Sequence, residues 1–123
     1  MRILVIEDNS DIAANLGDYL EDRGHTVDFA ADGVTGLHLA VVHDFDAIVL
    51  DLNLPGMDGI ETLRHIKQMK PEIEVIMLTG HASVEFGLKG MQLGAFDYVM
   101  KPAPRNELLD TINQAYSKKR GLH

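Results

Sequence analysis

Five polar residues of this sequence stand at the ends of short apolar runs: Glu7, Asp8, Asp51, Thr79 and Lys101. If the three carboxylates meet, they repel one another, by about 4 kcal/mol for two unit charges ~4 Å apart at an effective dielectric near 20. A hard divalent cation would offset this repulsion, and a carboxylate set with no Cys and no nearby His indicates magnesium rather than zinc. The lysine would add a second positive charge, and the threonine a neutral donor.

This combination of groups is suited to chemistry on phosphorus. A carboxylate held beside a magnesium ion and an ammonium group can attack a phosphoryl group and form an aspartyl phosphate. A carboxylate of the cluster would be the nucleophile, while Lys101 and Thr79 would stabilise charge on the equatorial oxygens. Metal binding without phosphoryl chemistry is the weaker interpretation, because it leaves the lysine and the threonine unexplained.

The apolar runs are typical of buried strands, and each is followed by a segment with helical periodicity. This alternation predicts an α/β fold, a doubly wound (βα)5 three-layer sandwich around a five-stranded parallel sheet. Ligands of open parallel sheets bind beyond the carboxyl ends of the strands, so the five polar residues are expected to converge at that edge. The predicted strands are residues 3–6, 27–30, 47–50, 75–78 and 96–100, and apolar helix positions include Ile12, Leu16 and Leu20, Val34, Leu37 and Val41, Ile60, Leu63 and Ile66, Leu88 and Met91, and Leu108, Ile112 and Tyr116.

The ends of the helices are also marked in the sequence. Asn9 or Ser10 can cap the start of the first helix through a side-chain oxygen. Gly24 and Gly94 can end helices, because glycine adopts the left-handed backbone that a helix C-terminus often needs.

Composition restricts the classes of protein to be considered. With 123 residues, 46% hydrophobic and 24% charged, the chain matches one ordinary globular domain, and no apolar run approaches the ~18 residues of a membrane span. The absence of cysteine excludes disulfides, and we expect a cytoplasmic protein. Residues 1–58 carry a net charge of −10 and residues 59–123 one of +2, which argues against direct nucleic-acid binding. The acidic half either binds cations or forms a merely solvated face, and charge totals do not separate these alternatives.

The residues singled out above lie in four motifs, and through them the chain resembles the receiver domain of two-component response regulators along essentially its whole length. The resemblance implies a flavodoxin-like receiver fold over residues 1–120, with 121–123 as a tail or the start of a linker. It also implies transfer of a phosphoryl group from a phosphohistidine of a sensor histidine kinase to Asp51. Glu7, Asp8 and Asp51 would hold Mg²⁺, with the backbone carbonyl of Asn53 as a further ligand. The motifs are ILVIED at residues 3–8, IVLDLNLPGMDG at 48–59, LTG at 78–80 and YVMKP at 98–102.

By the same resemblance, Thr79 and Tyr98 form a switch pair. Thr79 would bond the phosphoryl oxygen and Tyr98 would turn inward, which reshapes the surface of the fourth helix, fifth strand and fifth helix. That surface would control an output domain or an effector protein and could support a homodimer. The resemblance further implies a cis peptide bond between Lys101 and Pro102. Ala103 stands where the family usually has a large apolar residue, which affects the packing expected for the fifth helix.

Two classes of function follow from a phosphorylated Asp51. In the first, the domain is a signalling module that catalyses only its own phosphorylation and dephosphorylation. In the second, it is a phosphohydrolase resembling the haloacid-dehalogenase-like enzymes. That class needs a second acid two residues after the nucleophile, where this sequence has Asn53, so the signalling module is preferred.

Overall fold

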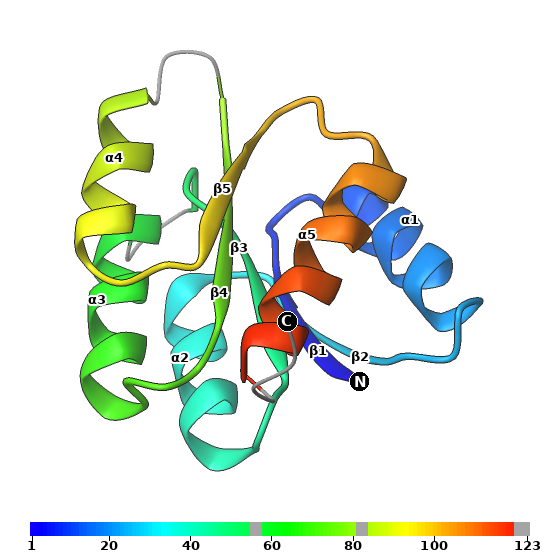
Figure 1. Ribbon diagram of the computed structural model, residues 1–123, viewed down its shortest axis with the longest axis horizontal. Helices are drawn as coiled ribbons and strands as arrows, with labels where there is room; N and C mark the ends of the chain where they lie inside the picture. Colours follow the sequence, from blue (N-terminus) through cyan, green and yellow to red (C-terminus); the bar gives the residue numbers. More distant parts are fainter. Residues whose placement is uncertain (55–57, 81–83, 120–123) are drawn as a thin grey trace.

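Five parallel strands form one sheet in the order β2-β1-β3-β4-β5, and a helix follows each strand along the chain (Figure 1). The computed structural model describes residues 1–54, 58–80 and 84–119, so motif residues 55–57 and tail residues 121–123 lie outside the described residues. The predicted doubly wound (βα)5 fold is confirmed. Its elements are β1 (Arg2–Ile6), α1 (Ser10–Glu21), β2 (Thr26–Ala30), α2 (Gly33–Val42), β3 (Ala47–Asp51), α3 (Gly59–Met69), β4 (Val75–Thr79), α4 (Val84–Gln92), β5 (Asp97–Met100) and α5 (Arg105–Lys119).

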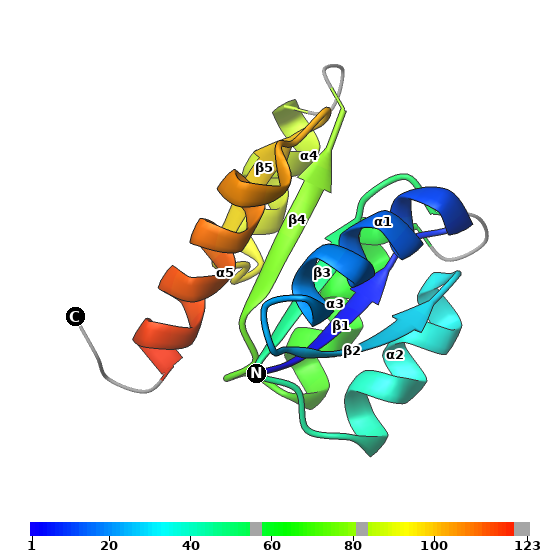
Figure 2. The ribbon, with the colours of Figure 1, turned by 90° about the vertical axis from the view of Figure 1, so that its right-hand side faces the viewer.

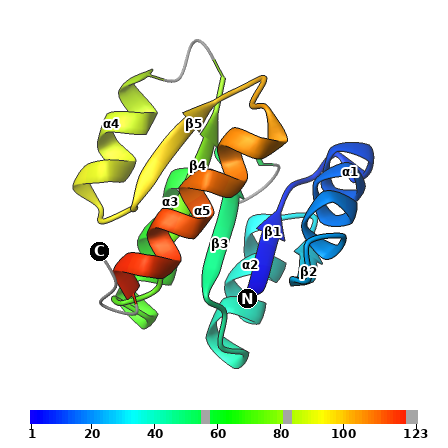
Figure 3. The same ribbon diagram turned by 45° about the vertical axis from the view of Figure 1, so that its right-hand side comes forward.

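The helices cover both faces of the sheet and so make three layers (Figures 2 and 3). Alternate residues of a strand point to opposite faces, and β1 divides in this way between two apolar cores. Ile3 and Val5 pack with residues of α1 and α5, whereas Leu4 and Ile6 pack with residues of α2 and α3. Burial of both faces explains why the central strands are uninterrupted apolar runs.

The strand predictions are confirmed to within one residue at each end. Every residue of β3 and β4 is buried, including Asp51 and Thr79, which are the last residues of their strands. The edge strand β2 is only partly buried, and this agrees with its more polar sequence. Since the polar residues end strands that are fixed by burial, their positions at the carboxyl edge follow from the apolar pattern.

The predicted helix ends are confirmed as well. Asn9 caps α1, because its Oδ1 accepts hydrogen bonds of 3.0 Å from the backbone N–H groups of Asp11 and Ile12. Gly24 and Gly94 have φ values of 88° and 104°, in the left-handed region that favours glycine.

The outward faces of α2 and α4 differ from the prediction. Val34 is 61% exposed and Leu88 is 55% exposed, although the apolar periodicity suggested that both are buried. α2 instead turns Gly36 toward the sheet, where an added Cβ would lie 2.5 Å from Cδ1 of Ile6. Small residues therefore bring these helices close to the sheet, and larger apolar residues face outward. None of the described helices has both the length and the apolar character needed to cross a membrane.

Candidate functional site

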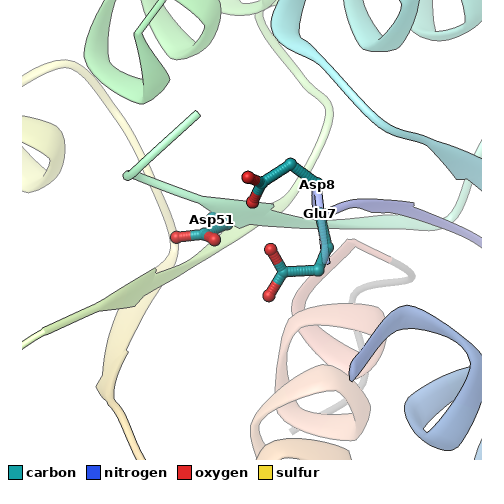
Figure 4. A group of neighbouring side chains, drawn as sticks. All are labelled: Glu7, Asp8 and Asp51. Carbon is teal, nitrogen blue, oxygen red and sulfur yellow. The ribbon is translucent and has the colours of Figure 1, made fainter. Parts of the chain in front are cut away.

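Three carboxylates converge where β1 and β3 end side by side (Figure 4). Ile6 and Leu50 are partners in the parallel register, so Glu7 and Asp51 occupy corresponding positions on neighbouring strands. Ligand oxygens of Glu7, Asp8 and Asp51 all lie within 4.8 Å of one another. Glu7 and Asp51 are only 4% and 2% exposed, whereas Asp8 faces solvent. The cluster is thus open to solvent at Asp8, whereas its other two carboxylates, those of Glu7 and Asp51, are buried.

Lys101 reaches this cluster from the loop that follows β5. Its Nζ lies 2.8 Å from Oδ2 of Asp51 and 3.6 Å from Oε1 of Glu7. The Lys101 backbone N–H donates to the carbonyl of Thr79, and the peptide bond between Lys101 and Pro102 is cis, as predicted. One ammonium group is therefore shared unequally by two buried carboxylates, and Asp51 holds the shorter ion pair.

Burial and charge alter the acidity of both Glu7 and Lys101. Burial of the Glu7 carboxyl, together with its hydrogen bond to Asp51 and the charge of that residue, raises the pKa of Glu7 to about 7. Burial would lower the pKa of Lys101, but the hydrogen bond and the charge of Asp51, reinforced by Glu7, outweigh it and raise this pKa above the usual lysine range. The site as a whole thus favours an additional positive charge.

The loop after β3 fixes the other side of Asp51. The backbone N–H of Asn53 donates to Oδ1 of Asp51 at 3.0 Å. Asp58 caps α3 by accepting from the N–H of Glu61 at 2.8 Å, and Gly59 begins that helix. A Cβ at Gly59 would lie 2.9 Å from the carbonyl oxygen of Asp51, so only glycine lets α3 start this close to the strand end. This contact was not predicted from the sequence, where the glycine in the motif was the available signal.

Thr79 and Tyr98 lie on the same face of the sheet. Tyr98 is the register partner of Met77, and Thr79 follows Met77 by two residues, which places all three on one side. α4 covers that side, because a Cβ at Gly87 would lie 3.3 Å from Cδ2 of Tyr98. The Thr79 hydroxyl donates to the carbonyl of Gly80 at 3.1 Å. Thr79 therefore lies at the carboxyl edge of the sheet, and Tyr98 lies on the same face under α4.

A groove of about 710 Å³ between α1 and α5 opens beside Lys101. Apolar side chains such as Leu16 and Leu108 line it, and the small Ala103 lies in its wall. Ile12, at its α1 side, is 45% exposed. The small residue at position 103 is apparent in the sequence, but the groove could not be predicted, because the apolar pattern does not determine the distance between two helices.

The sequence matches the profile of the response regulator receiver domain over residues 3–113. The chain belongs to this family. Among relatives of the receiver domain, the cell cycle response regulator CtrA of Brucella ovis is 36% identical over 121 residues, which are 98% of this chain and 52% of that protein. The chain spans about half the length of the curated relatives it matches.

Solved receiver domains share its fold. One from Methanospirillum hungatei JF-1, described as CheY-like, superposes with a TM-score of 0.93 at 32% identity and covers 98% of this chain and 96% of its own. Another from Clostridium thermocellum gives 0.93 at 35% identity, with coverages of 99% and 98%. The expected receiver fold is confirmed, and membership of a regulatory family supports a signalling module over the phosphohydrolase alternative.

Proposed function

We propose that this receiver domain works in the cytoplasm and accepts a phosphoryl group on Asp51 from a phosphohistidine of a sensor histidine kinase. The observation that carries the proposal is the ion pair of 2.8 Å between Asp51 and Lys101 inside a cluster of three carboxylates. An aspartate that only ended a strand at the surface would be solvated, whereas Asp51 is buried beside a lysine and two further acids.

The residues present fit a magnesium ion. Glu7, Asp8 and Asp51 offer oxygen ligands, and the backbone carbonyl of Asn53 would supply one more. Oε1 of Glu7 is buried, accepts no hydrogen bond from the described residues and lies 3.6 Å from Nζ of Lys101, so it is a ligand atom for which a bound cation would supply a closer partner. When bound, the cation would screen the charge of the nucleophile from that of the incoming phosphoryl group.

Phosphoryl transfer would use both sides of the Asp51 carboxylate. A carboxylate oxygen forms the new P–O bond while the P–N bond to the donor histidine breaks and its electron pair returns to the imidazole nitrogen. The N–H of Asn53, which donates to Oδ1, orients the carboxylate. Lys101 then pairs with an oxygen of the transferred group, where its positive charge stabilises the charge that develops.

The donor must approach where the site meets solvent, which is at Asp8 and at Lys101. The side chain of Lys101 is 29% exposed, and the apolar groove between α1 and α5 begins beside it. Ile12 offers exposed apolar area there. We assign this groove to the phosphohistidine-bearing protein, because a partner bound there would present its phosphoryl group close to Asp51.

Phosphorylation would be transmitted by Thr79 and Tyr98. A phosphoryl group adds negative charge and acceptor oxygens, and the Thr79 hydroxyl is a donor that can turn toward them. Movement of Thr79 would make room for Tyr98, which lies under α4. The resulting change in the α4-β5-α5 surface would control an output domain or effector, or pair two copies of the domain.

The test uses acetyl phosphate as a small phosphoryl donor. Intact-mass measurement after incubation with acetyl phosphate and Mg²⁺ should show the mass of one phosphoryl group on the protein. Asp51→Asn should remove this addition, whereas Asp18→Asn, on exposed α1 surface, should retain it. An undiminished modified fraction in Asp51→Asn, or repeated turnover of a phosphomonoester, would refute the proposal.

A further inference from the structure

The outer side of α2 carries an apolar stripe. The helix contains no charged residue, and its Gly36 faces the sheet. Val34, Val41 and Val42 point outward and are 61%, 36% and 57% exposed. His38 is exposed on the same side, because residues at positions i, i+4, i+7 and i+8 share one face of a helix. In a globular domain this apolar pattern normally faces a core, so the outer side of α2 has the character of a buried surface.

We infer that a second copy of this domain covers the α2 stripe, with the two α2 helices antiparallel across a two-fold axis at His38. The α2 stripe consists of Val34, His38, Val41 and Val42. In a two-fold contact the same patch meets itself, so it has to be free of like charges. The chain has a net charge of −8, and two copies therefore repel each other over much of their surface. The uncharged α2 stripe is a place where they can meet with little of this repulsion.

The charged groups at the two ends of α2 are complementary under this symmetry. Asp32 caps the N-terminus of the helix, where its side chain accepts from the N–H of Thr35 at 2.7 Å. At the C-terminus, Nζ of Lys70 donates to the carbonyl of His43 at 2.9 Å and pairs with Asp44 at 3.1 Å. Antiparallel helices bring Asp32 of each copy toward Lys70 of the other. They also place the positive end of one helix dipole beside the negative end of the other.

The α2 stripe is separate from the surfaces discussed above. α3 packs against both α2 and α4, and α4 lies apart from α2 (Figures 1 and 2). Association through the α2 stripe therefore differs from pairing through the α4-β5-α5 surface and needs no phosphoryl group. α5 packs on the opposite face of the sheet, so a segment that continued from it would not start beside the α2 stripe. The stripe is small compared with the roughly 20 residues that each partner contributes to a standard interface, so the dimer should be weak.

The first test measures the oligomeric state of the unphosphorylated protein in EDTA. Sedimentation equilibrium should show the mass rising from monomer toward dimer as the protein concentration enters the high micromolar range. Val34→Glu should weaken the association about tenfold or more, because it places a carboxylate against Val42 of the second copy. Leu88→Glu makes the same kind of exchange on α4, where Leu88 is 55% exposed, and should leave the association unchanged. A mass that stays monomeric at every concentration, or equal weakening by the two variants, would overturn the inference.

The second test locates the two-fold axis by cross-linking. The chain contains no cysteine, so a single introduced thiol reports on one position. A residue on a two-fold axis lies next to its own counterpart, and His38→Cys should therefore form a disulfide-linked dimer when copper phenanthroline and dissolved oxygen oxidise the two thiols. Leu88→Cys should stay monomeric under the same conditions. A linked dimer from Leu88→Cys but not from His38→Cys would assign the contact to α4 and overturn the inference.

Discussion

Removal of one charge from the acidic cluster should stabilise the metal-free domain. Asp8 is the best choice, since it lies within 4.8 Å of Glu7 and Asp51 but is exposed and is not the proposed phosphoryl acceptor. At 4.8 Å, one pair of like charges repels by about 1 kcal/mol under the screening of water and by about 3 kcal/mol at an effective dielectric of 20. Lys101 is paired with Glu7 and Asp51 and so reduces the net charge that Asp8 faces, and the exposure of Asp8 favours the lower value.

Asp8→Asn should therefore raise the free energy of unfolding by about 1 kcal/mol at pH 8, which corresponds to a melting temperature about 4 °C higher for a domain of this size. Thermal unfolding followed by circular dichroism in EDTA measures this shift, with Asp18→Asn as a matched loss of one aspartate charge. Added Mg²⁺ should stabilise the wild type more than Asp8→Asn. A lower melting temperature for Asp8→Asn than for the wild type in EDTA would refute the claim that these carboxylates repel one another. An equal rise in melting temperature for Asp8→Asn and Asp18→Asn would refute it as well.

Two further predictions concern pH and packing. The pKa of Glu7 is raised from 4.5 to about 7, so the folded state holds this proton more tightly than the unfolded state. Its contribution to stability is complete below pH 4.5 and is lost as pH rises through 7, by about 3 kcal/mol. Urea unfolding without metal should show this loss as a difference between wild type and Glu7→Gln, and parallel pH profiles would contradict it. Gly59→Ala should destabilise the domain by about 3 kcal/mol, because the new Cβ meets the backbone of Leu52 and Asp51. Gly90→Ala should cost less, since its Cβ meets the flexible side chain of Met77; similar urea midpoints for the two variants would show that the distinction is wrong.

The fold could be predicted because burial on both faces leaves an uninterrupted apolar run in each central strand. β3 and β4 are entirely buried, so their boundaries followed from hydrophobicity alone, and Asp51 and Thr79 were located as the strand ends. The parallel order of the strands then brought the carboxylates to one edge. The acidic cluster was thus a consequence of topology, which the alternation of strand and helix reveals.

The orientation of α2 and α4 could not be predicted from the same pattern. α2 contains no charged residue, so its apolar periodicity does not distinguish the buried face from the exposed one. The glycines decide instead: Gly36 lies against Ile6, and Gly87 lies against Tyr98. A glycine gives no hydrophobic signal, although it determines how closely a helix approaches the sheet.

The contacts of Lys101 with both Asp51 and Glu7 could not be predicted from the sequence either. The motif predicted a lysine at the carboxyl edge, but its distances of 2.8 Å to Asp51 and 3.6 Å to Glu7 depend on the path of the loop after β5. The longer side chain of Glu7, compared with aspartate, is part of that geometry. Loop path and side-chain reach are set by tertiary packing, which local periodicity does not encode.

The most direct test of the central claim identifies the residue that carries the phosphoryl group. After phosphorylation with acetyl phosphate and Mg²⁺, borohydride reduces an aspartyl phosphate to homoserine, which peptide mass spectrometry locates in the chain. We predict homoserine at position 51 and at no other aspartate. Homoserine at a different position, or a phosphoryl group that resists borohydride and remains on a hydroxyl side chain, would contradict the assignment of Asp51 as the phosphoryl acceptor.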